Sequence, residues 1–380
     1  MLDRTSKRDP EAAIPSSGEL IERAVELVPL LRANAPKTEQ LRCLPEDSIR
    51  ALEEAGVFRM LQPTARDGYG SDPATVSQVM TTIASGCAST TWVLMIYSAV
   101  GQLAELLSEQ ALAEIYAGDH PKIAGVFGRA GAVIERDGDG FRVRGGGNWP
   151  FNSGCRHATW DLLRLTVEEP DGTTWPAFVA VPMAELTLCD DWDVMGAVGT
   201  GSNSVTCDAL FIPEHRVARI PADLRGVINA HASAATSCAL PLGMVRYAFE
   251  DFVELARTRA INHLGYARMG DAPVVQSAVA QAAVDIKLIE CYQQWMLSPY
   301  TGGPGIDPHE AGLMAIGSVR CFELARGVIE RLLALCPSTE VHRTKPMQRL
   351  LRDIHVFEHQ HAATPFINYE LYGRKFFARD

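Results

Sequence analysis

The stretch that decides the fold is Trp192–Val217, WDVMGAVGTGSNSVTCDALFIPEHRV. Gly199 and Gly201 stand among hydroxyl side chains, and such a segment predicts a turn with many free backbone N–H donors. The residues that follow predict a strand from Val205 to Phe211. Pro213 is expected to end this strand, because proline has no N–H to donate to a sheet. Taken alone, the segment is also compatible with an ordinary Gly-Ser hairpin.

The spacing of apolar residues divides the chain into three parts that follow a polar start. Residues 1–17 are polar and contain prolines, which predicts a mobile N-terminus. Helical spacing over 18–120 predicts an α domain, in which Pro29 should kink or interrupt the first helix. Short β-type runs over 121–220 predict a compact antiparallel β domain. Helical spacing returns over 221–380, so the sequence predicts an α+β multidomain protein with a central barrel and a C-terminal helix bundle.

Composition excludes several classes of function. The chain has 380 residues, of which 47% are hydrophobic and 21% charged, as in a soluble globular enzyme. A formal net charge of -11 argues against a nucleic-acid partner. Nine scattered cysteines without a CxxC pair favour a reducing compartment. The sequence shows no apolar signal region and no run long enough to span a membrane, so we expect a cytoplasmic protein with no membrane partner.

Four segments, taken in order, resemble one flavoprotein superfamily. Leu44–Gly70 resembles its first helix pair and the turn that follows, and Ile83–Trp92 the stretch where its helical domain meets the isoalloxazine. Gly140–Trp160 resembles its flavin-facing strand and turn, and the segment around Gly199 its middle-domain signature. The chain thus resembles the acyl-CoA dehydrogenase fold over nearly all of residues 40–380. The resemblance implies an N-terminal α-helical domain, a central β-barrel and a C-terminal four-helix bundle.

The residue at the position of the catalytic base separates two chemistries within this superfamily. An acyl-CoA dehydrogenase needs a carboxylate to remove an α-proton, and many members carry that glutamate eight residues after an Arg-Asp pair. Counting eight residues from Asp353 reaches His361 instead. Glu250 and Glu254 stay candidates for a base on an earlier helix. The chain is therefore most similar to the oxygenase components of two-component (group D) flavin-dependent monooxygenases.

That resemblance implies a definite chemistry. A separate flavin reductase supplies reduced flavin, O2 is the co-substrate, and a C4a-(hydro)peroxyflavin delivers one oxygen to an aromatic or related small organic substrate. An imidazole at His361 could deprotonate a phenol or hold the distal oxygen, and the site must exclude water to avoid releasing H2O2. The motifs around Trp149–Gly154 and Glu370–Arg374 also look more like monooxygenases. The alternatives are an acyl-CoA dehydrogenase, an oxygenase of an aryl- or acyl-CoA thioester, and a non-enzymatic binding protein.

The candidate site residues come from these motifs. The expected catalytic residues are His361, Ser153 and His157. The expected cofactor-binding residues are Trp92, Trp149, Phe151, Asn152, Ser153, Thr200, Ser202, Arg259 and Gln276. Each has an ordinary structural alternative: the tryptophans could be core aromatics, and Asn152 and Ser153 could serve only the turn.

Cofactor identity and assembly rest on the resemblance. In dehydrogenases of this fold, an Arg-x-x-Phe-Gly motif and a later Gln from a neighbouring subunit bind the FAD pyrophosphate. Arg259 and Gln276 keep that order, although the Phe-Gly is missing, so reduced FAD (FADH2) is favoured over FMN. The apolar helix over 274–289 has more faces than one bundle covers, and we expect a homotetramer. His355 and His359 share a helix face without a third ligand, so no metal is expected.

Overall fold

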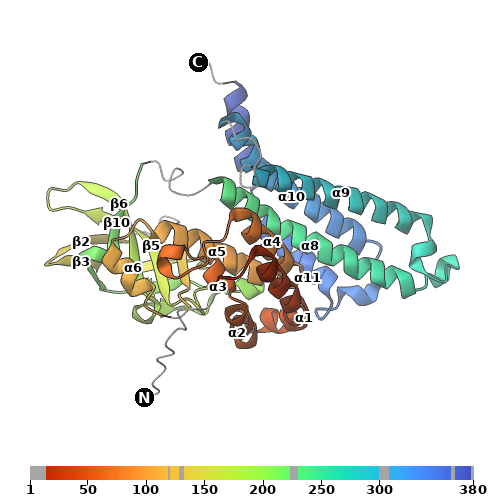
Figure 1. The fold of residues 1–380 in the computed structure, drawn as a ribbon, viewed down its shortest axis with the longest axis horizontal. Coiled ribbons are helices and arrows are strands. Elements are labelled where there is room, and N and C mark those ends of the chain that lie inside the picture. Colours follow the sequence, from red (N-terminus) through yellow and green to blue (C-terminus); the bar gives the residue numbers. More distant parts are fainter. Residues whose placement is uncertain are drawn as a thin grey trace.

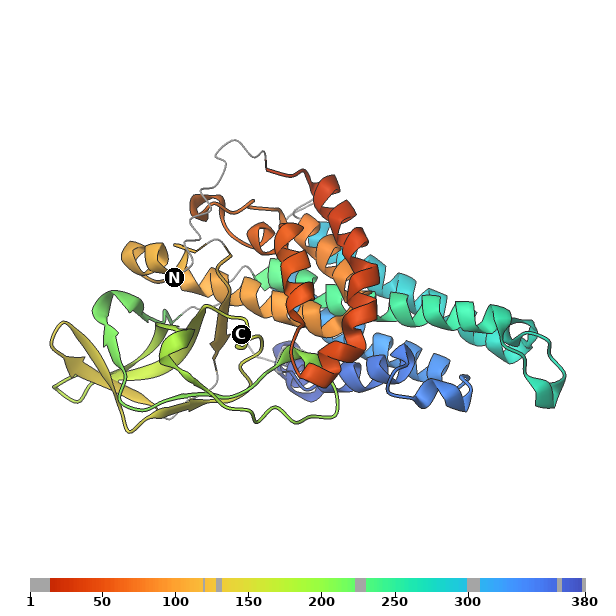
Figure 2. The same cartoon turned by 90° about the horizontal axis from the view of Figure 1, so that it is seen from below.

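The protein is described by a computed structural model that covers residues 14–118, 120–127, 132–222, 230–298, 308–360 and 364–377. Two sheets lie at one end of the molecule, and a bundle of long helices extends away from them (Figures 1 and 2). The N-terminal helices lie between the two. Buried apolar side chains form one cluster between these helices and the sheets and a second within the bundle.

The N-terminal helices have well-defined ends. They are α1 (Ser17–Leu41), α2 (Glu46–Glu54), α3 (Val57–Met60), α4 (Pro73–Ala84), α5 (Ala88–Ala104) and α6 (Glu109–Ile115). A capping box formed by Ser16 and Glu19 starts α1. The prediction that Pro29 interrupts this helix is wrong, because α1 continues through it. Pro29 is exposed, whereas Leu27 and Leu31 on either side are buried, and that burial outweighs one lost backbone hydrogen bond.

The β region contains two sheets. Its strands are β1 (Ile123–Val126), β2 (Val133–Asp137), β3 (Gly140–Arg144), β4 (Gly147–Trp149), β5 (Trp160–Glu168), β6 (Thr174–Pro182), β7 (Thr187–Leu188), β8 (Val205–Cys207), β9 (Phe211–Pro213) and β10 (Val217–Arg219). A seven-stranded sheet has the order β10-β6-β5-β2-β3-β9, with β1 also paired to β5, and a three-stranded sheet has the order β4-β8-β7. The predicted central barrel therefore consists of two separately hydrogen-bonded sheets.

Two details of the β prediction need correction. The larger sheet is mixed rather than antiparallel, because β1 and β2 both pair in parallel with β5, whose length accommodates them one after the other. The strand predicted over 205–211 is two strands. β8 pairs with β4 and β7 in the smaller sheet, whereas β9 pairs with β3 in the larger one. Strand pairing is interrupted between β8 and β9 because the chain passes from one sheet to the other.

The C-terminal helices form the bundle. They are α8 (Ala230–Thr258), α9 (Pro273–Leu297), α10 (Pro308–Leu333), α11 (Pro346–Phe357) and α12 (Pro365–Gly373). The central helix, α8, packs against α9, α10 and α11, and also against α4 of the N-terminal group. The α8–α9 hairpin ends far from the sheets (Figure 1). Within the described residues, no helix combines the length and the apolar character that crossing a membrane requires.

Candidate active site

A chain of hydroxyl groups links the β region to α5. The indole Nε1 of Trp92 donates to Ser153 Oγ over 3.0 Å, and Ser153 Oγ lies 2.7 Å from Ser202 Oγ. Ser202 Oγ in turn lies 2.7 Å from Thr200 Oγ1. All three hydroxyl-bearing residues are buried. We call Ser153, Ser202 and Thr200 the hydroxyl ladder. Thr200 Oγ1 donates onward to Ala197 O over 2.8 Å, so the hydroxyl protons are used along the ladder, and its oxygens keep lone pairs that can accept from a ligand.

The turn after β4 holds Ser153 in place. Gly154 N donates to Thr200 O over 2.9 Å, and Tyr97 Oη donates to Gly154 O over 2.6 Å. Gly154 has φ +79°, and a Cβ there would come within 2.8 Å of Tyr97 Oη. Glycine is required at this position, because a side chain would be strained in the left-handed backbone conformation and would collide with the Tyr97 phenol. Tyr97 therefore fixes this turn from the side of α5.

The second turn, which carries Thr200 and Ser202, is held by α11. Asp353 on α11 is buried, and its Oδ1 accepts a 2.7 Å hydrogen bond from Ala197 N. Burial raises the pKa of Asp353 to about 6. A Cβ on Gly196 would lie 2.1 Å from Arg352 O, so the turn packs directly on the helix backbone. The Arg-Asp pair recognised in the sequence thus connects the bundle to the hydroxyl ladder.

A buried acid lies beneath the first turn. Asn152 Nδ2 donates a short hydrogen bond to Oδ2 of Asp161 on β5. Burial raises the pKa of Asp161 to about 7. Asn152 Oδ1 and Asp161 Oδ1 are both buried without a hydrogen-bond partner. Asn152, predicted as a cofactor contact, therefore bonds a strand carboxyl through its side chain.

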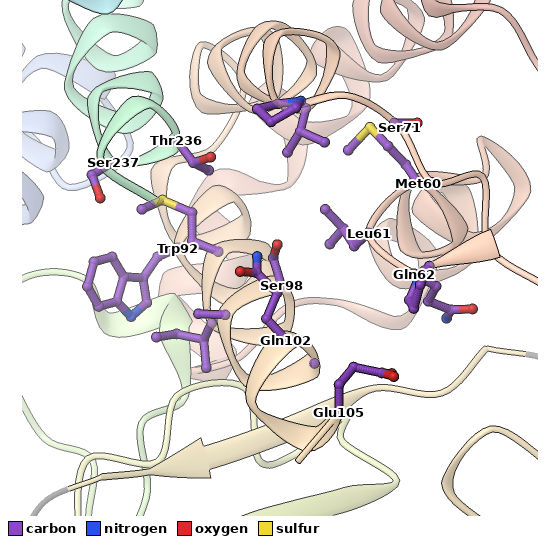
Figure 3. Close-up of a pocket in the computed structure, with 18 of the residues that line it drawn as sticks. Met60, Leu61, Gln62, Ser71, Trp92, Ser98, Gln102, Glu105, Thr236 and Ser237 are labelled. Carbon is purple, nitrogen blue, oxygen red and sulfur yellow. The ribbon is translucent and has the colours of Figure 1, made fainter. Parts of the chain in front are cut away.

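A cavity of about 640 Å³ lies beside Trp92 (Figure 3). Its walls come from α3 and the loop after it, the start of α4, one face of α5, and parts of α8 and α10. Apolar side chains such as Met60, Met95 and Phe322 make up much of the wall. The members of the hydroxyl ladder do not line it, so Trp92 is the residue that joins the ladder to the cavity.

The cavity carries almost no charge. Glu105 is the one ionisable side chain among its described lining residues. Burial raises the pKa of Glu105, while Arg66, 3.8 Å away, acts in the opposite direction. The remaining polar lining consists of serine, threonine and glutamine side chains, for example Ser98, Gln102 and Thr236. Such a lining favours a neutral ligand with a few polar groups.

The predicted catalytic His157 has structural partners. Its Nε2 lies 2.8 Å from Leu44 O and its Nδ1 lies 3.4 Å from Glu46 Oε1. Burial lowers the pKa of this imidazole. His157 does not line the cavity; it ties the turn after β4 to the start of α2.

The two predicted aromatic contacts near Ser153 lie in different surroundings. Trp149 is fully buried, and its Nε1 donates to Arg164 O over 3.3 Å within the β core. Phe151 has φ +64° and is 69% exposed, with its ring edge against Trp192 at a centroid distance of 6.0 Å. A left-handed phenylalanine is strained, and such strain concentrates at ligand sites. Phe151 is thus available to a ligand at the surface of this turn.

Arg259 and Gln276 lie at the other end of the molecule. Both are exposed, in the connection between α8 and α9 and at the start of α9. Gln276 Nε2 donates to Gly270 O over 3.0 Å. Figure 1 shows that this end of the hairpin is remote from the sheets. Within one chain, these residues are therefore separated from the hydroxyl ladder.

The end of α11 leads to the cavity. Phe357 packs on Trp92 with a ring-centroid distance of 5.2 Å, and Gln360 lines the cavity. His361, the predicted acid/base residue, lies outside the described residues. His355 lies 3.4 Å from Glu330, on the side of α10.

The two alternative base candidates do not line the cavity. Glu250 forms an ion pair with Arg32 at 2.8 Å, and Glu254 pairs with Arg257 at 3.3 Å. A base for α-proton removal must reach the substrate. Neither glutamate has that position in this chain.

Sequence reasoning missed the cavity wall formed by α5 and the turn that follows it. Its members Met95, Ala99, Gln102 and, just after the helix, Leu106 recur at three- and four-residue spacing. That spacing was visible in the sequence, but it is also the spacing of an ordinary buried face. Asp161 and Tyr97 were missed as well, because nothing in their local sequence marks a buried acid or a turn clamp.

Comparison with known proteins identifies the family. The profile of the acyl-CoA dehydrogenase C-terminal domain matches residues 235–365. The oxygenase component of the FADH2-dependent resorcinol hydroxylase from Rhizobium sp. (strain MTP-10005) is 30% identical over 288 residues, covering 70% of this chain and 69% of that protein. The chain belongs to the oxygenase components of flavin-dependent monooxygenases. The predicted family, enzyme class and acyl-CoA dehydrogenase-like fold are thereby confirmed.

Other members of the family agree along the whole chain. The flavin-dependent monooxygenase oxygenase subunit HsaA from Rhodococcus jostii (strain RHA1) is 29% identical over 93% of this chain and 97% of its own. The structure of XiaF from Streptomyces sp. in complex with FADH2 and glycerol is 25% identical, with a TM-score of 0.85 and 96% coverage of both chains. The 3-HSA hydroxylase from Rhodococcus sp. RHA1 has a TM-score of 0.81 at 28% identity, covering 95% of this chain and 98% of that one.

The residues present fit a flavin. Three buried hydroxyls lie in a row beside a tryptophan, and Asn203 Nδ2 is buried nearby without a partner. A ring donor could bond a lone pair of these hydroxyls, and a ring acceptor could bond Asn203 Nδ2. Trp92 would then lie between the flavin contacts and the cavity.

Proposed function

We propose that this monooxygenase hydroxylates an aromatic compound that binds in the cavity beside Trp92. One observation carries the proposal: the indole of Trp92 bonds to the hydroxyl ladder and also lines the cavity. Reduced flavin, when bound, supplies the electrons that activate O2 for transfer of one oxygen atom. The relatives include a resorcinol hydroxylase and a p-hydroxyphenylacetate 3-hydroxylase, which supports a phenolic substrate.

The residues of the chain would bind the flavin, orient the substrate and exclude water. Ser153, Ser202 and Thr200 would hold the polar edge of the flavin ring, and Tyr97 and Asp353 keep the two supporting turns in place. The apolar wall of the cavity would exclude water around the reacting carbon, which limits loss of the activated oxygen as H2O2. The substrate ring would lie against Trp92, on the cavity side.

His361 is the proposed acid/base residue. It follows Gln360, which lines the cavity. An imidazole has a pKa near neutrality and can accept the phenol proton at its ring nitrogen. Removing that proton raises the electron density of the aromatic ring and favours attack by an electrophilic oxygen. Ser153 and His157 have a supporting role in this proposal, since both hold the turn after β4.

The alternative readings have less support from the site. A CoA thioester carries phosphates, and the described lining of the cavity offers one acid and no cation. A dehydrogenase also needs a carboxylate over the substrate, whereas Glu250 and Glu254 are engaged in ion pairs away from the cavity. A neutral aromatic substrate suits this lining better than a CoA ester.

A separate reductase and a homotetramer complete the proposal. The relatives are named oxygenase subunits or components, which fits a second protein that delivers reduced flavin. FADH2 is favoured because it appears with XiaF and with the resorcinol hydroxylase, whereas FMN is bound in a more distant structure, TdsC from Paenibacillus sp. A11-2. Arg259 and Gln276, exposed at the far end of the hairpin, would reach the flavin of a neighbouring subunit.

Isotope labelling tests the proposed function. The protein, with chemically reduced FAD or FMN, is mixed with ¹⁸O2 and a panel of phenols, indoles and aryl-CoA esters. We expect one ¹⁸O atom in a hydroxylated phenolic product. Reduction of bound oxidised flavin by an acyl-CoA, with formation of an enoyl-CoA, would establish the dehydrogenase alternative instead. Failure to bind flavin in either redox state would indicate a non-enzymatic protein.

A further inference from the structure

One face of α5 runs along the whole cavity. Trp92 lies at one end of this lining, Ala99 near its middle, and Glu105, just after the helix, at the other end. Because an α-helix rises 1.5 Å per residue, the thirteen steps from Trp92 to Glu105 span about 20 Å. Figure 3 shows Trp92 at one end and Glu105 with Gln62 at the other. The cavity is therefore long compared with a single aromatic ring.

The volume leads to the same conclusion. An apolar cavity of roughly 150 Å³ is enough to bind benzene. The cavity measures about 640 Å³, roughly four times as much, and the hydroxyl ladder does not line it. A lone phenol would leave most of this apolar wall without contacts, which costs dispersion energy. The shape fits a molecule of several rings.

The end remote from Trp92 is polar. Glu105, the first residue after α5, lies there, and Gln62 approaches from the loop after α3. Gln62 is buried, and its Nε2 has no hydrogen-bond partner. A buried amide donor without a partner is destabilising, so a ligand oxygen or a reoriented amide that satisfies it would be favoured.

We propose that the substrate is an elongated, uncharged aromatic compound that lies along α5. Its reacting ring lies against Trp92, and a distal hydroxyl meets Gln62 and Glu105. The orientation of the ligand, with its reacting ring at Trp92, rests on the proposed function. A hydroxyl matches this end because it can donate to the Glu105 carboxylate and accept from a glutamine amide. A distal carboxylate would place two like charges together and is disfavoured.

Equilibrium dialysis with four probes tests this inference without turnover. The probes are phenol and three rigid 4-substituted terphenyl-type phenols that end in a hydroxyl, a methyl or a carboxylate. The hydroxyl-ended probe should bind at least tenfold more tightly than phenol. The methyl-ended probe should bind two- to tenfold more weakly than the hydroxyl-ended one, the effect of about one hydrogen bond. The carboxylate-ended probe should be the weakest of the long probes.

Two variants locate the ligand along the helix. Ala99→Phe fills the middle of the cavity and should weaken every long probe more than tenfold while phenol changes less than twofold. Gln62→Leu should abolish the difference between the hydroxyl- and methyl-ended probes. Glu54→Gln is the matched control, because Glu54 is an exposed carboxylate on α2 that does not line the cavity. It should leave all four dissociation constants unchanged.

The outcomes separate this inference from the proposed function. Long probes that bind no better than phenol, or that ignore Ala99→Phe, would overturn the inference even if phenol is hydroxylated. Long probes that bind as described but incorporate no ¹⁸O would support the elongated cavity and overturn the hydroxylase proposal. Preferential binding of the carboxylate-ended probe would overturn the assignment of a neutral ligand.

Discussion

Trp92 has three contacts that no other described residue combines. Its Nε1 donates to Ser153, its ring packs on Phe357, and its side chain lines the cavity. The motif Ile83–Trp92 predicted that this tryptophan lies near the flavin, but not that it also lines a cavity. A tryptophan suits this place because it combines a large apolar ring with one hydrogen-bond donor.

Removing only the indole donor should weaken flavin binding. Trp92→Phe keeps an aromatic ring on Phe357 but loses the hydrogen bond to Ser153, which costs about 0.5 to 1.5 kcal/mol. We expect the dissociation constant of reduced flavin to rise about two- to tenfold in an anaerobic fluorescence titration. Trp175→Phe on β6 is the control, since it loses a comparable 3.0 Å bond to Glu169. An equal effect in both variants would contradict a local role of Trp92.

His361→Ala should uncouple flavin oxidation from hydroxylation. Loss of one acid/base group slows the catalysed step roughly 10²- to 10⁴-fold, while the hydroxyl ladder remains to bind flavin. Reduced flavin should still be consumed, with H2O2 released and product nearly absent, as measured by peroxide and product assays. Ser153→Ala should instead weaken flavin or substrate binding. Wild-type coupling in His361→Ala, with uncoupling in His359→Ala or His157→Ala, would move the acid/base role to that histidine.

At the scale of elements, β5 carries the buried Asp161 under the turn that holds Ser153. Its pKa is raised to about 7, against about 3.9 for an unfolded aspartate. Between these values the folded state binds more protons than the unfolded state, so the free energy of unfolding falls as pH rises from about 4 to 7. This contribution is fully present below about pH 4 and is lost above about pH 7.

Asp161→Asn should reduce this pH dependence. An amide at position 161 cannot ionise, so Tm should fall less steeply between about pH 5 and pH 7 than in the wild type. Differential scanning calorimetry at several pH values measures the slope. Asp171→Asn, at an exposed turn, is the control and should keep the wild-type slope. An unchanged slope in Asp161→Asn would show that Asp161 is ionised throughout this range.

The elements also show what local sequence can and cannot specify. The glycine-rich turn around Gly201 and the turn at Ser153 were predicted because their chemistry is local. The break between β8 and β9 was not, since it depends on which sheet each half joins. The lining face of α5 was not predicted either, because whether an apolar helix face meets a neighbouring helix or a cavity is decided by the packing of distant helices. His361 was identified only by counting from Asp353.

At the scale of the whole molecule, α9 supports the proposed assembly. Val274, Val284 and Leu288 are each more than half exposed and lie within one sector of the helix. Exposed apolar residues on one helix face are typical of subunit interfaces. The sequence argument that this helix has more apolar faces than one bundle covers is consistent with that exposure.

We expect a mass near four times 41.4 kDa by light scattering at micromolar concentration. The double variant Val284→Asp and Leu288→Asp should lower the mass, because charges in an apolar interface are costly to desolvate. Val25→Asp, at an exposed position on α1, should leave it unchanged. A wild-type mass near one chain would contradict the homotetramer.

The arrangement of α5 has an evolutionary consequence. Trp92 belongs to the first half of α5 and bonds to the hydroxyl ladder, whereas Ala99, Gln102 and, just beyond the end of the helix, Leu106 follow at three- and four-residue spacing. Under the proposed function, each of these positions sets how far a molecule can extend, without touching the proposed flavin contacts. Selection can therefore lengthen or shorten the accepted molecule by about one helical turn, roughly 5 Å, per substitution. The lining positions of one helix thus determine the length of the molecule that fits, and they can change while the proposed flavin contacts stay the same.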